Sequence, residues 1–401
     1  MIQKKCLLLA VIVWCCTITY GQQVVNTKAV FSDVEQQTEY LSKKVDAIKT
    51  KTLEFPRTTV HDSLKLVVSG DWTSGFWAGE LWFLYQYTGK AAWKEKAQEA
   101  TQLMNREQWN RSSHDVGFKI YCSYGNGYRL TKDTAYEHVI IQAAKTLATR
   151  FNSKIGCIRS WDFRNSWQYP VIIDNMMNLE LLFAATRLSH DSSFYRIAVS
   201  HANTTLKNHF RSDYSSYHVV DYDTLTGKPI KKITAQGYAD SSAWARGQAW
   251  ALYGYTMCYR ETHNTTYLKQ AEHVANFILT NPHIPVDMVP YWDYNVPDPG
   301  QEPRDASAAA ITASALYELS QYSKQGKAFK KAADEITKSL TDHYRAAINT
   351  NEGFILMHST GHKPAHSEID VPLIYADYYY LEALLRANTL SHKTSESLSK
   401  Q

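Results

Sequence analysis

Three aspartates stand where apolar helical patterns begin, at Asp115, Asp174 and Asp305. Each could be a helix N-cap, because an aspartate in that position accepts the free amide hydrogens of the first turn. Asp174 departs from a simple cap, since the apolar run Val171–Ile173 precedes it. Apolar surroundings disfavour the charged carboxylate and raise its pKa, which suits a general acid near neutral pH. Two carboxylates facing one cleft would provide the chemistry of glycoside hydrolysis.

A second group of polar and aromatic residues combines His218 with the segment 236–250, which begins at Gln236. Within it Arg246 and Trp250 have the i, i+4 spacing that places both side chains on one helix face. A guanidinium binds a carboxylate through a fork of donors, and an indole stacks on a sugar ring. The alternative is that Arg246 pairs with a structural aspartate and Trp250 only packs in the core.

Tryptophans in loops, with Trp72 and Trp161 as the clearest cases, are candidates for sugar-stacking surfaces. Aromatic residues make up 13% of the chain, and core packing explains that excess equally well. The sequence has no glycine-rich phosphate loop, no G-x-S-x-G nucleophile turn and no H-E-x-x-H pair. We therefore predict no metal and no cofactor. The 43 basic and 39 acidic residues are nearly balanced and form no dense basic run, which argues against nucleic acid as a partner.

Helical periodicity dominates the chain and repeats in pairs, each joining a helix rich in small and aromatic residues to a more amphipathic one. Helices of the first kind are expected at 75–87, from 115 onward, and at 174–188, 246–259, 305–322 and 371–388. Five amphipathic partners follow the first five, and the helix 34–53, closed by Pro56, supplies a sixth. Hairpins that cannot bury their faces alone must stack on neighbours. We therefore predict an all-α fold, an (α/α)6 barrel.

An open helical solenoid is the alternative architecture, but the long linkers 213–240 and 281–304 are unlike regular solenoid turns. Such loops on one rim of a barrel are where a site is expected. Strand-like alternation is scarce, and Tyr217–Tyr222 and Gly353–Met357 are the best candidates.

The first residues have the character of a secretory signal peptide. Lys4 and Lys5 precede an apolar run, and Gly21 offers a small residue for cleavage. We predict that residues 1–21 are removed, that residues 22–401 form a single catalytic domain, and that the protein is periplasmic or secreted. No later stretch is apolar enough over 18 residues to span a membrane.

The cysteines after the signal peptide are Cys122, Cys157 and Cys258. Their wide spacing predicts neither a zinc site nor a disulfide framework, and at most one bridge can form. Neither the oligomeric state nor a lipid anchor is predicted.

Four motifs occur in order: Asp-Trp-Thr-Ser-Gly-Phe-Trp-Ala-Gly at 71–79, His-Asp-Val-Gly-Phe at 114–118, Ile-Ile-Asp-Asn-Met-Met-Asn-Leu at 172–179 and Ser-Ser-Ala-Trp-Ala-Arg-Gly-Gln-Ala-Trp at 241–250. Together they resemble the unsaturated glucuronyl hydrolases, glycoside hydrolase family 88. The resemblance extends over most of the chain after the predicted signal peptide. It implies an (α/α)6 barrel, in agreement with the helix pattern.

The resemblance also implies an activity, which is removal of a 4,5-unsaturated uronic acid from the non-reducing end of oligosaccharides left by polysaccharide lyases. In the implied mechanism an acid protonates C4 of the vinyl ether and water adds at C5. By motif position Asp174 matches the general acid/base and Asp115 the second essential carboxylate, which has to stay anionic. Substrate-binding roles are implied for six further residues, namely His218, Gln236, Arg246, Trp250, Trp161 and Trp72.

The segment 357–363 falls where some family members recognise substrate sulfate, and Ser359, His362 and Lys363 could form an anion pocket there. Three other functions stay open: an unsaturated rhamnogalacturonyl hydrolase acting on pectin fragments, a non-catalytic periplasmic glycan-binding protein, and a sugar epimerase on the same barrel. The parent polysaccharide and the preferred linkage are not predicted.

Overall fold

The structure, a computed structural model, describes residues 25–163 and 166–399. The predicted signal peptide lies outside the described residues. Among the helices of the described part, none combines the length and the apolar character needed to cross a membrane.

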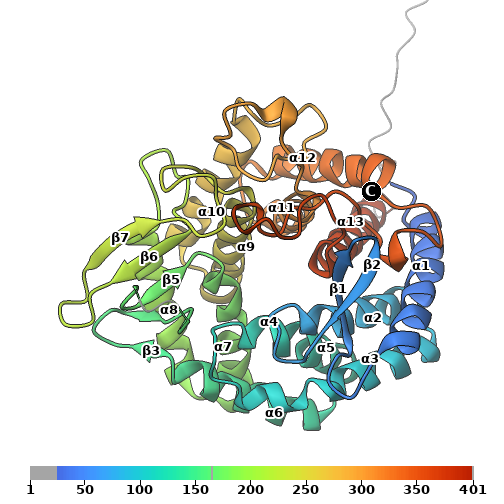
Figure 1. Cartoon of the computed structure of the whole chain (residues 1–401), viewed down its shortest axis with the longest axis horizontal. Coiled ribbons are helices and arrows are strands. Elements are labelled where there is room, and N and C mark those ends of the chain that lie inside the picture. The colour runs from blue at the N-terminus through green and yellow to red at the C-terminus, as the bar shows by residue number, and fades with distance from the viewer. Residues whose placement is uncertain (1–24, 164–165, 400–401) are drawn as a thin grey trace, which may run out of the picture.

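The described helices form a closed double ring, seen along its axis in Figure 1. The inner ring consists of α2 (Ser74–Thr88), α4 (Val116–Ile120) with α5 (Asn126–Thr131), α7 (Asn175–Ser189), α9 (Ala245–Thr262), α11 (Ala306–Leu319) and α13 (Ile374–Ser399). The outer ring consists of α1 (Thr27–Ile48), α3 (Ala91–Leu103), α6 (Thr134–Ala148), α8 (Ser192–Asn208), α10 (Thr265–Thr280) and α12 (Gly326–Ser339). Because α13 packs on α2, the inner ring closes. The predicted (α/α)6 barrel is confirmed, with α1 as the sixth outer helix.

The inner helices α9 and α11 are buried on nearly all sides, whereas the outer helices bury a single face. Every residue of α11 is buried, and most of its side chains are small. In α12 the buried residues are Phe329, Ala332, Ala333, Ile336 and others on the same stripe, with lysines on the opposite face. Small residues therefore crowd around the axis, and amphipathic helices separate them from solvent.

Glycine permits the closest approach between inner helices. A Cβ atom on Gly75 of α2 would lie 2.4 Å from the backbone oxygens of Phe118 and Lys119. A Cβ atom on Gly117 of α4 would lie 2.6 Å from the Cα atom of Asn178 in α7. Any larger residue would push α4 away from its neighbours, and α4 begins beside the candidate site.

Short strands connect the helices at one end of the ring. A hairpin of β1 (Phe55–Val60) and β2 (Ser63–Val67) packs against α2 and α13 (Figure 1). A three-stranded antiparallel sheet is built from β5 (Pro170–Ile172), β6 (Val219–Tyr222) and β7 (Pro229–Ile233), with Ile172 paired to Val219. A shorter pair, β3 (Phe151–Asn152) with β4 (Cys157–Ile158), lies beside α8.

The predicted strand at 217–222 is confirmed as β6, but the one at 353–357 was wrong. There the carboxylate of Asp377 accepts the amide hydrogens of Ile355 and Leu356, each at 2.8 Å. Those donors are therefore not available to a sheet, and a single bridge from Leu356 to Arg345 forms instead. Cys122, Cys157 and Cys258 are buried free thiols.

Candidate active site

A cavity of about 680 Å³ opens at the end of the ring where the inner helices begin. The loops that precede α2, α4, α7, α9 and α13, or the first turns of these helices, contribute residues to it. Among the residues that line it are Arg57, Trp72, His114, Asp115, Phe118, Trp161, Phe163, Asp174, Gln236, Arg246, His362, Glu368 and Tyr375. Because helix N-termini carry partial positive charge, this end of the ring favours anionic groups.

The three aspartates of the sequence pattern divide into one cap and two candidates for chemistry. Asp305 caps α11, since its carboxylate accepts amide hydrogens from Ser307 and Ala308. Asp115 and Asp174 occupy the N-cap positions of α4 and α7, yet neither side chain makes a capping hydrogen bond. Their carboxylates face the cavity instead, so capping explains Asp305 alone.

Asp174 follows strand β5 after one residue, the buried Ile173, at the start of α7. Within the described residues its Oδ2 atom is buried and has no hydrogen-bond partner. Burial raises the pKa of Asp174 to about 7, and the nearby charge of Asp115 adds to that rise. The guanidinium of Arg246 and the indole of Trp250 act in the opposite direction. Asp174 therefore exchanges a proton near neutral pH, as a general acid requires.

His218 of the segment before β6 points one ring nitrogen at this acid. Its Nε2 atom lies 3.7 Å from Oδ2 of Asp174. Its Nδ1 atom accepts amide hydrogens from Ala235 at 3.1 Å and Gln236 at 3.2 Å. Trp161 meets the imidazole edge-on at 5.8 Å between ring centres. The neutral imidazole thus carries its proton on Nε2, facing the acid.

Arg246 and Gln236 hold a backbone segment that forms one wall of the cavity. Arg246 donates from Nη1 to Asp305 Oδ2 at 2.9 Å and to the carbonyl of Thr360 at 2.7 Å. Its Nη2 atom and the side-chain amide of Gln236 both donate to the carbonyl of Gly361, at 2.6 and 3.0 Å. The pairing of Arg246 with a structural aspartate, considered as an alternative, is thus present, and its charge still borders the cavity.

The predicted tryptophans occupy different depths. Trp72 and Trp161 are half-buried and line the cavity. Trp250 is fully buried beneath the floor, where it packs against Phe118 at 5.2 Å and Tyr379 at 5.4 Å between ring centres. Trp250 therefore supports the floor and lies under Asp174, while the other two tryptophans have exposed ring surface for a sugar.

The structure does not assemble the predicted anion pocket. Ser359 is fully buried and its backbone pairs with Val371. Lys363 forms an ion pair with Glu302 and lies over the ring of Trp292 at 5.1 Å from its centre. Of the three predicted residues His362 alone is among those lining the cavity. A sulfate-binding role for Ser359 and Lys363 stays a prediction.

Among the lining residues that were not predicted as site residues, Arg57 and Glu368 form an ion pair. Arg57 Nε lies 2.5 Å from Glu368 Oε1, and its Nη1 lies 2.7 Å from Asp71 Oδ2. The guanidinium therefore ties the β1–β2 hairpin to the loop before α2 and to the loop 358–370. No short-range pattern marks this pair, since 311 residues separate Arg57 from Glu368.

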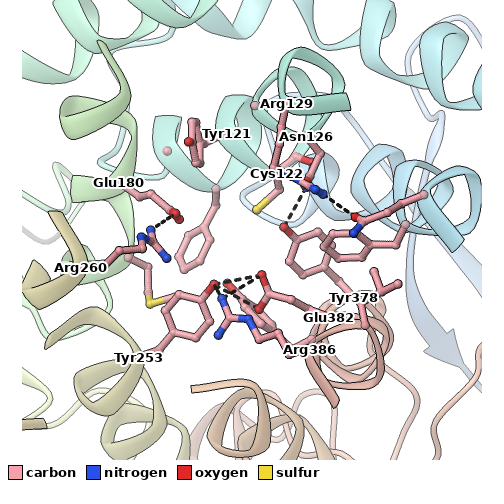
Figure 2. Close-up of a pocket in the computed structure, with 18 of the residues that line it drawn as sticks. Tyr121, Cys122, Asn126, Arg129, Glu180, Tyr253, Arg260, Tyr378, Glu382 and Arg386 are labelled. Carbon is pink, nitrogen blue, oxygen red and sulfur yellow. Dashed lines mark hydrogen bonds and ion pairs between the residues drawn. The ribbon is translucent and has the colours of Figure 1, made fainter. Parts of the chain in front are cut away.

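A second cavity, of about 390 Å³, lies where α7, α9 and α13 run toward their C-terminal ends, and Figure 2 shows it. Its charged groups pair with one another. Arg260 contacts Glu180 and Glu318, and Arg386 contacts Glu318 and Glu382. This network ties α7, α9, α11 and α13 together, so we assign it to ring stability and the first cavity to chemistry.

An (α/α)6 barrel with a protonatable aspartate and a second carboxylate in an aromatic-lined cavity defines a glycan-active enzyme. Residues 43–389 match Glycosyl Hydrolase Family 88. The chain belongs to this family and is a glycoside hydrolase.

Named relatives agree with the family. The chain is 50% identical to an unsaturated glucuronyl hydrolase of Formosa agariphila over 84% of this chain and 85% of that protein. It is 34% identical to an unsaturated chondroitin disaccharide hydrolase of Streptococcus pneumoniae over 83% and 86% of the two chains. The crystal structure of an unsaturated glucuronyl hydrolase specific for heparin superposes with a TM-score of 0.87 at 45% identity, over 91% of this chain and 98% of that one.

Proposed function

We propose that the protein removes a 4,5-unsaturated glucuronic acid from the non-reducing end of disaccharides that lyases release from glycosaminoglycans. The observation that carries this proposal is Asp174, a carboxyl with a pKa of about 7 that shares a cavity with a second carboxylate, Asp115. The substrate class is supported by the named relatives, which are unsaturated glucuronyl and chondroitin disaccharide hydrolases.

The proposed chemistry is hydration of the vinyl ether. Protonated Asp174 gives its proton to C4, and positive charge develops at C5 and the ring oxygen. The carboxylate of Asp115 stabilises that charge. Water then adds at C5 and returns a proton to Asp174, which restores the acid. The resulting hemiketal opens, and the glycosidic bond breaks without further catalysis.

Neighbouring groups are arranged to support these steps. The Nε2–H group of His218 lies 3.7 Å behind the carboxyl of Asp174, and Gln236 lines the cavity, where it is placed to hold the attacking water. The cavity volume suits a disaccharide. Trp72 and Trp161 offer ring surface on its walls. Since no displacement takes place at C1, the carboxylate separation that distinguishes retaining from inverting enzymes does not apply.

The near-ultraviolet absorbance of unsaturated disaccharides tests the proposal, because the conjugated enoate absorbs and its hydrated product does not. We expect absorbance loss with the wild type, and a rate at least about 100-fold lower for Asp174→Asn. Calorimetry should show that Asp174→Asn still binds the disaccharide. Asp133→Asn is the matched control, since Asp133 is an exposed cap of α6 and asparagine caps equally well.

Other outcomes would redirect the proposal. Turnover of rhamnose-linked pectin fragments, with none of hexosamine-linked disaccharides, would replace it by the rhamnogalacturonyl alternative. Binding by the wild type without absorbance loss would favour a glycan-binding protein. A changed sugar configuration with the double bond retained would indicate an epimerase.

We also propose that the protein acts outside the cytoplasm, in the periplasm or after secretion. The support is the signal-like sequence of residues 1–21. Sequencing the N-terminus of the protein recovered from cell fractions tests this, and an intact residue 1 in the cytoplasmic fraction would contradict it.

A further inference from the structure

His114 is a buried histidine beside the second carboxylate of the site. Its side chain is 1% exposed, and its Nε2 atom lies 3.2 Å from Oδ1 of Asp115. The hydroxyl of Ser113 donates to the other carboxylate oxygen, Oδ2, at 3.0 Å. Each oxygen of Asp115 therefore has one local donor, and the remaining lone pairs are available to the cavity.

The surroundings of the imidazole determine which nitrogen carries its proton. The Oγ atom of Ser160 accepts the amide hydrogen of Ile172 at 3.0 Å and lies 3.4 Å from His114 Nδ1. The side-chain amide of Asn175 also donates to that Oγ, at 3.4 Å. With its lone pairs taken, the hydroxyl of Ser160 donates to Nδ1. Burial lowers the pKa of His114, against the attraction of Asp115 and the side chain of Asn175, which favours the neutral ring. With Nδ1 accepting from Ser160, the proton of the neutral ring lies on Nε2, toward Asp115.

The same few residues connect the two carboxylate-bearing turns. The amide of His114 donates to the carbonyl of Ser160 at 3.2 Å, and the amide of Ser160 donates to the carbonyl of Pro170 at 2.8 Å. The side chain of Asn175, directly after Asp174, donates to the carbonyl of Ile158 at 2.8 Å. The segment 158–160 is thus hydrogen-bonded to both turns.

We propose that His114 is a positioning residue, which with Ser160 holds the carboxylate of Asp115 in one orientation relative to Asp174. The directed chain runs from the Ile172 amide through the Ser160 hydroxyl and the imidazole to Asp115. The use of this arrangement in catalysis rests on the proposed function, whereas the hydrogen-bond chain itself does not.

Three variants measure the kinetic part. We expect His114→Ala to lower kcat/KM for an unsaturated disaccharide by about 100-fold, the typical cost of a misplaced catalytic group. His114→Gln should recover part of that loss, because the glutamine amide nitrogen can replace Nε2 as the donor to Asp115. The kcat/KM of Ser160→Ala should lie between those of His114→Ala and His114→Gln. His209→Gln is the matched control, since His209 is likewise buried and its ring contacts the carbonyl of Val171 in β5, whereas that of His114 contacts Asp115.

A double-mutant cycle separates positioning from a merely structural role. If His114 acts through Asp115, then His114→Ala costs little in an Asp115→Asn background, whereas independent effects would multiply. The proposal would be overturned if the losses of kcat/KM from His114→Ala and Asp115→Asn multiplied in the double variant. It would also be overturned if His209→Gln lowered kcat/KM as much as His114→Gln does. If His114→Ala does not fold, the same cycle is run with His114→Gln.

Nitrogen-15 NMR of histidine-labelled enzyme tests the chain without any substrate. The His114 signals, assigned by their loss in His114→Gln, should show the neutral ring protonated at Nε2 and should change in Ser160→Ala. A charged ring, or a proton on Nδ1, would overturn the proposal. A wild type that shows the expected tautomer but turns over no disaccharide would contradict the proposed function and leave the hydrogen-bond chain standing.

Discussion

The Nε2 atom of His218 lies 3.7 Å from Oδ2 of Asp174, and two backbone amides fix the proton of His218 on that nitrogen. The donor and the acid are therefore oriented before a substrate arrives. As Asp174 loses its proton to C4, a carboxylate oxygen forms opposite a preorganised N–H group. Preorganised donors of this kind stabilise charge that develops during the reaction.

Loss of the donor from His218 should impair turnover without loosening the loop. In His218→Asn the asparagine oxygen can replace Nδ1 as acceptor for the Ala235 and Gln236 amides, while Nε2 is lost. We expect kcat to fall by about 100-fold, with a melting temperature close to that of the wild type. His201→Asn is the control, since His201 also accepts a backbone amide through Nδ1, from Ile158 at 3.0 Å. Unchanged kcat in His218→Asn would contradict this role.

The pH dependence of activity should follow Asp174. Its pKa of about 7 means that the acid is protonated below neutral pH and loses its proton above it. We expect kcat/KM to decline on the alkaline side with an apparent pKa near 7. An alkaline limb that begins above pH 9 would show that another group limits the reaction.

The same group affects stability. Because the folded carboxyl holds its proton more tightly than the unfolded one, stability decreases as pH rises from about 4 to about 7. Asp174→Asn should remove that decrease and be more stable than the wild type at pH 8, by on the order of 2 kcal/mol. Denaturant unfolding at pH 5 and pH 8 measures the difference, and equal gains at both pH values would contradict the predicted sign.

A buried acid pair should give a second pH effect, away from the cavity. Burial raises the pKa values of Glu80 in α2 and Asp377 in α13. Because these carboxyl pKa values are higher in the folded state than in the unfolded state, stability is lost as the pH rises toward the pKa values of the folded state. Glu80→Gln should therefore raise the melting temperature more at pH 9 than at pH 5.

Glu318→Gln is the contrasting variant for that experiment. Burial alone would raise the pKa of Glu318, but Arg260 and Arg386 hold it below its usual value. Its stabilising effect is present above the unfolded pKa of about 4.3 and is lost in acid. The variant should be less stable than the wild type by about 3 kcal/mol at neutral pH, because buried guanidiniums lose a partner. If the stability differences of Glu80→Gln and Glu318→Gln changed with pH in the same direction, one of the two predicted signs would be wrong.

The position of Lys363 gives a prediction about sulfate. Since Lys363 pairs with Glu302 and is not among the residues lining the cavity, Lys363→Ala should change the turnover of sulfated and unsulfated disaccharides by the same factor. A selective loss on the sulfated substrate would instead support the anion pocket predicted from the sequence. His362→Ala serves as the comparison, because His362 does line the cavity.

The ring of helices could be predicted because the apolar periodicity of each helix is visible in its own short stretch of sequence. Asp174 could be predicted as a candidate acid because apolar residues precede it directly in the sequence. Strand β5 was missed, since three residues show no alternation. Strand β1 was missed because Pro56 was interpreted as a helix stop, although it lies inside the strand. Lys363 is held by Glu302 and Arg57 by Glu368. The partners in each pair are far apart along the chain, so no local sequence pattern could predict these positions.

Arg57 should control substrate binding more than the chemical step. Its guanidinium bridges Glu368 and Asp71, so Arg57→Met leaves the loop 358–370 without its main tie to the hairpin. We expect KM to rise about 10-fold, kcat to change less than threefold, and proteolysis within that loop to accelerate. Arg345→Met is the control, since the pair of Arg345 with Asp33 lies outside the cavity. A fall in kcat at unchanged KM would place Arg57 in the chemical step and contradict the positioning role.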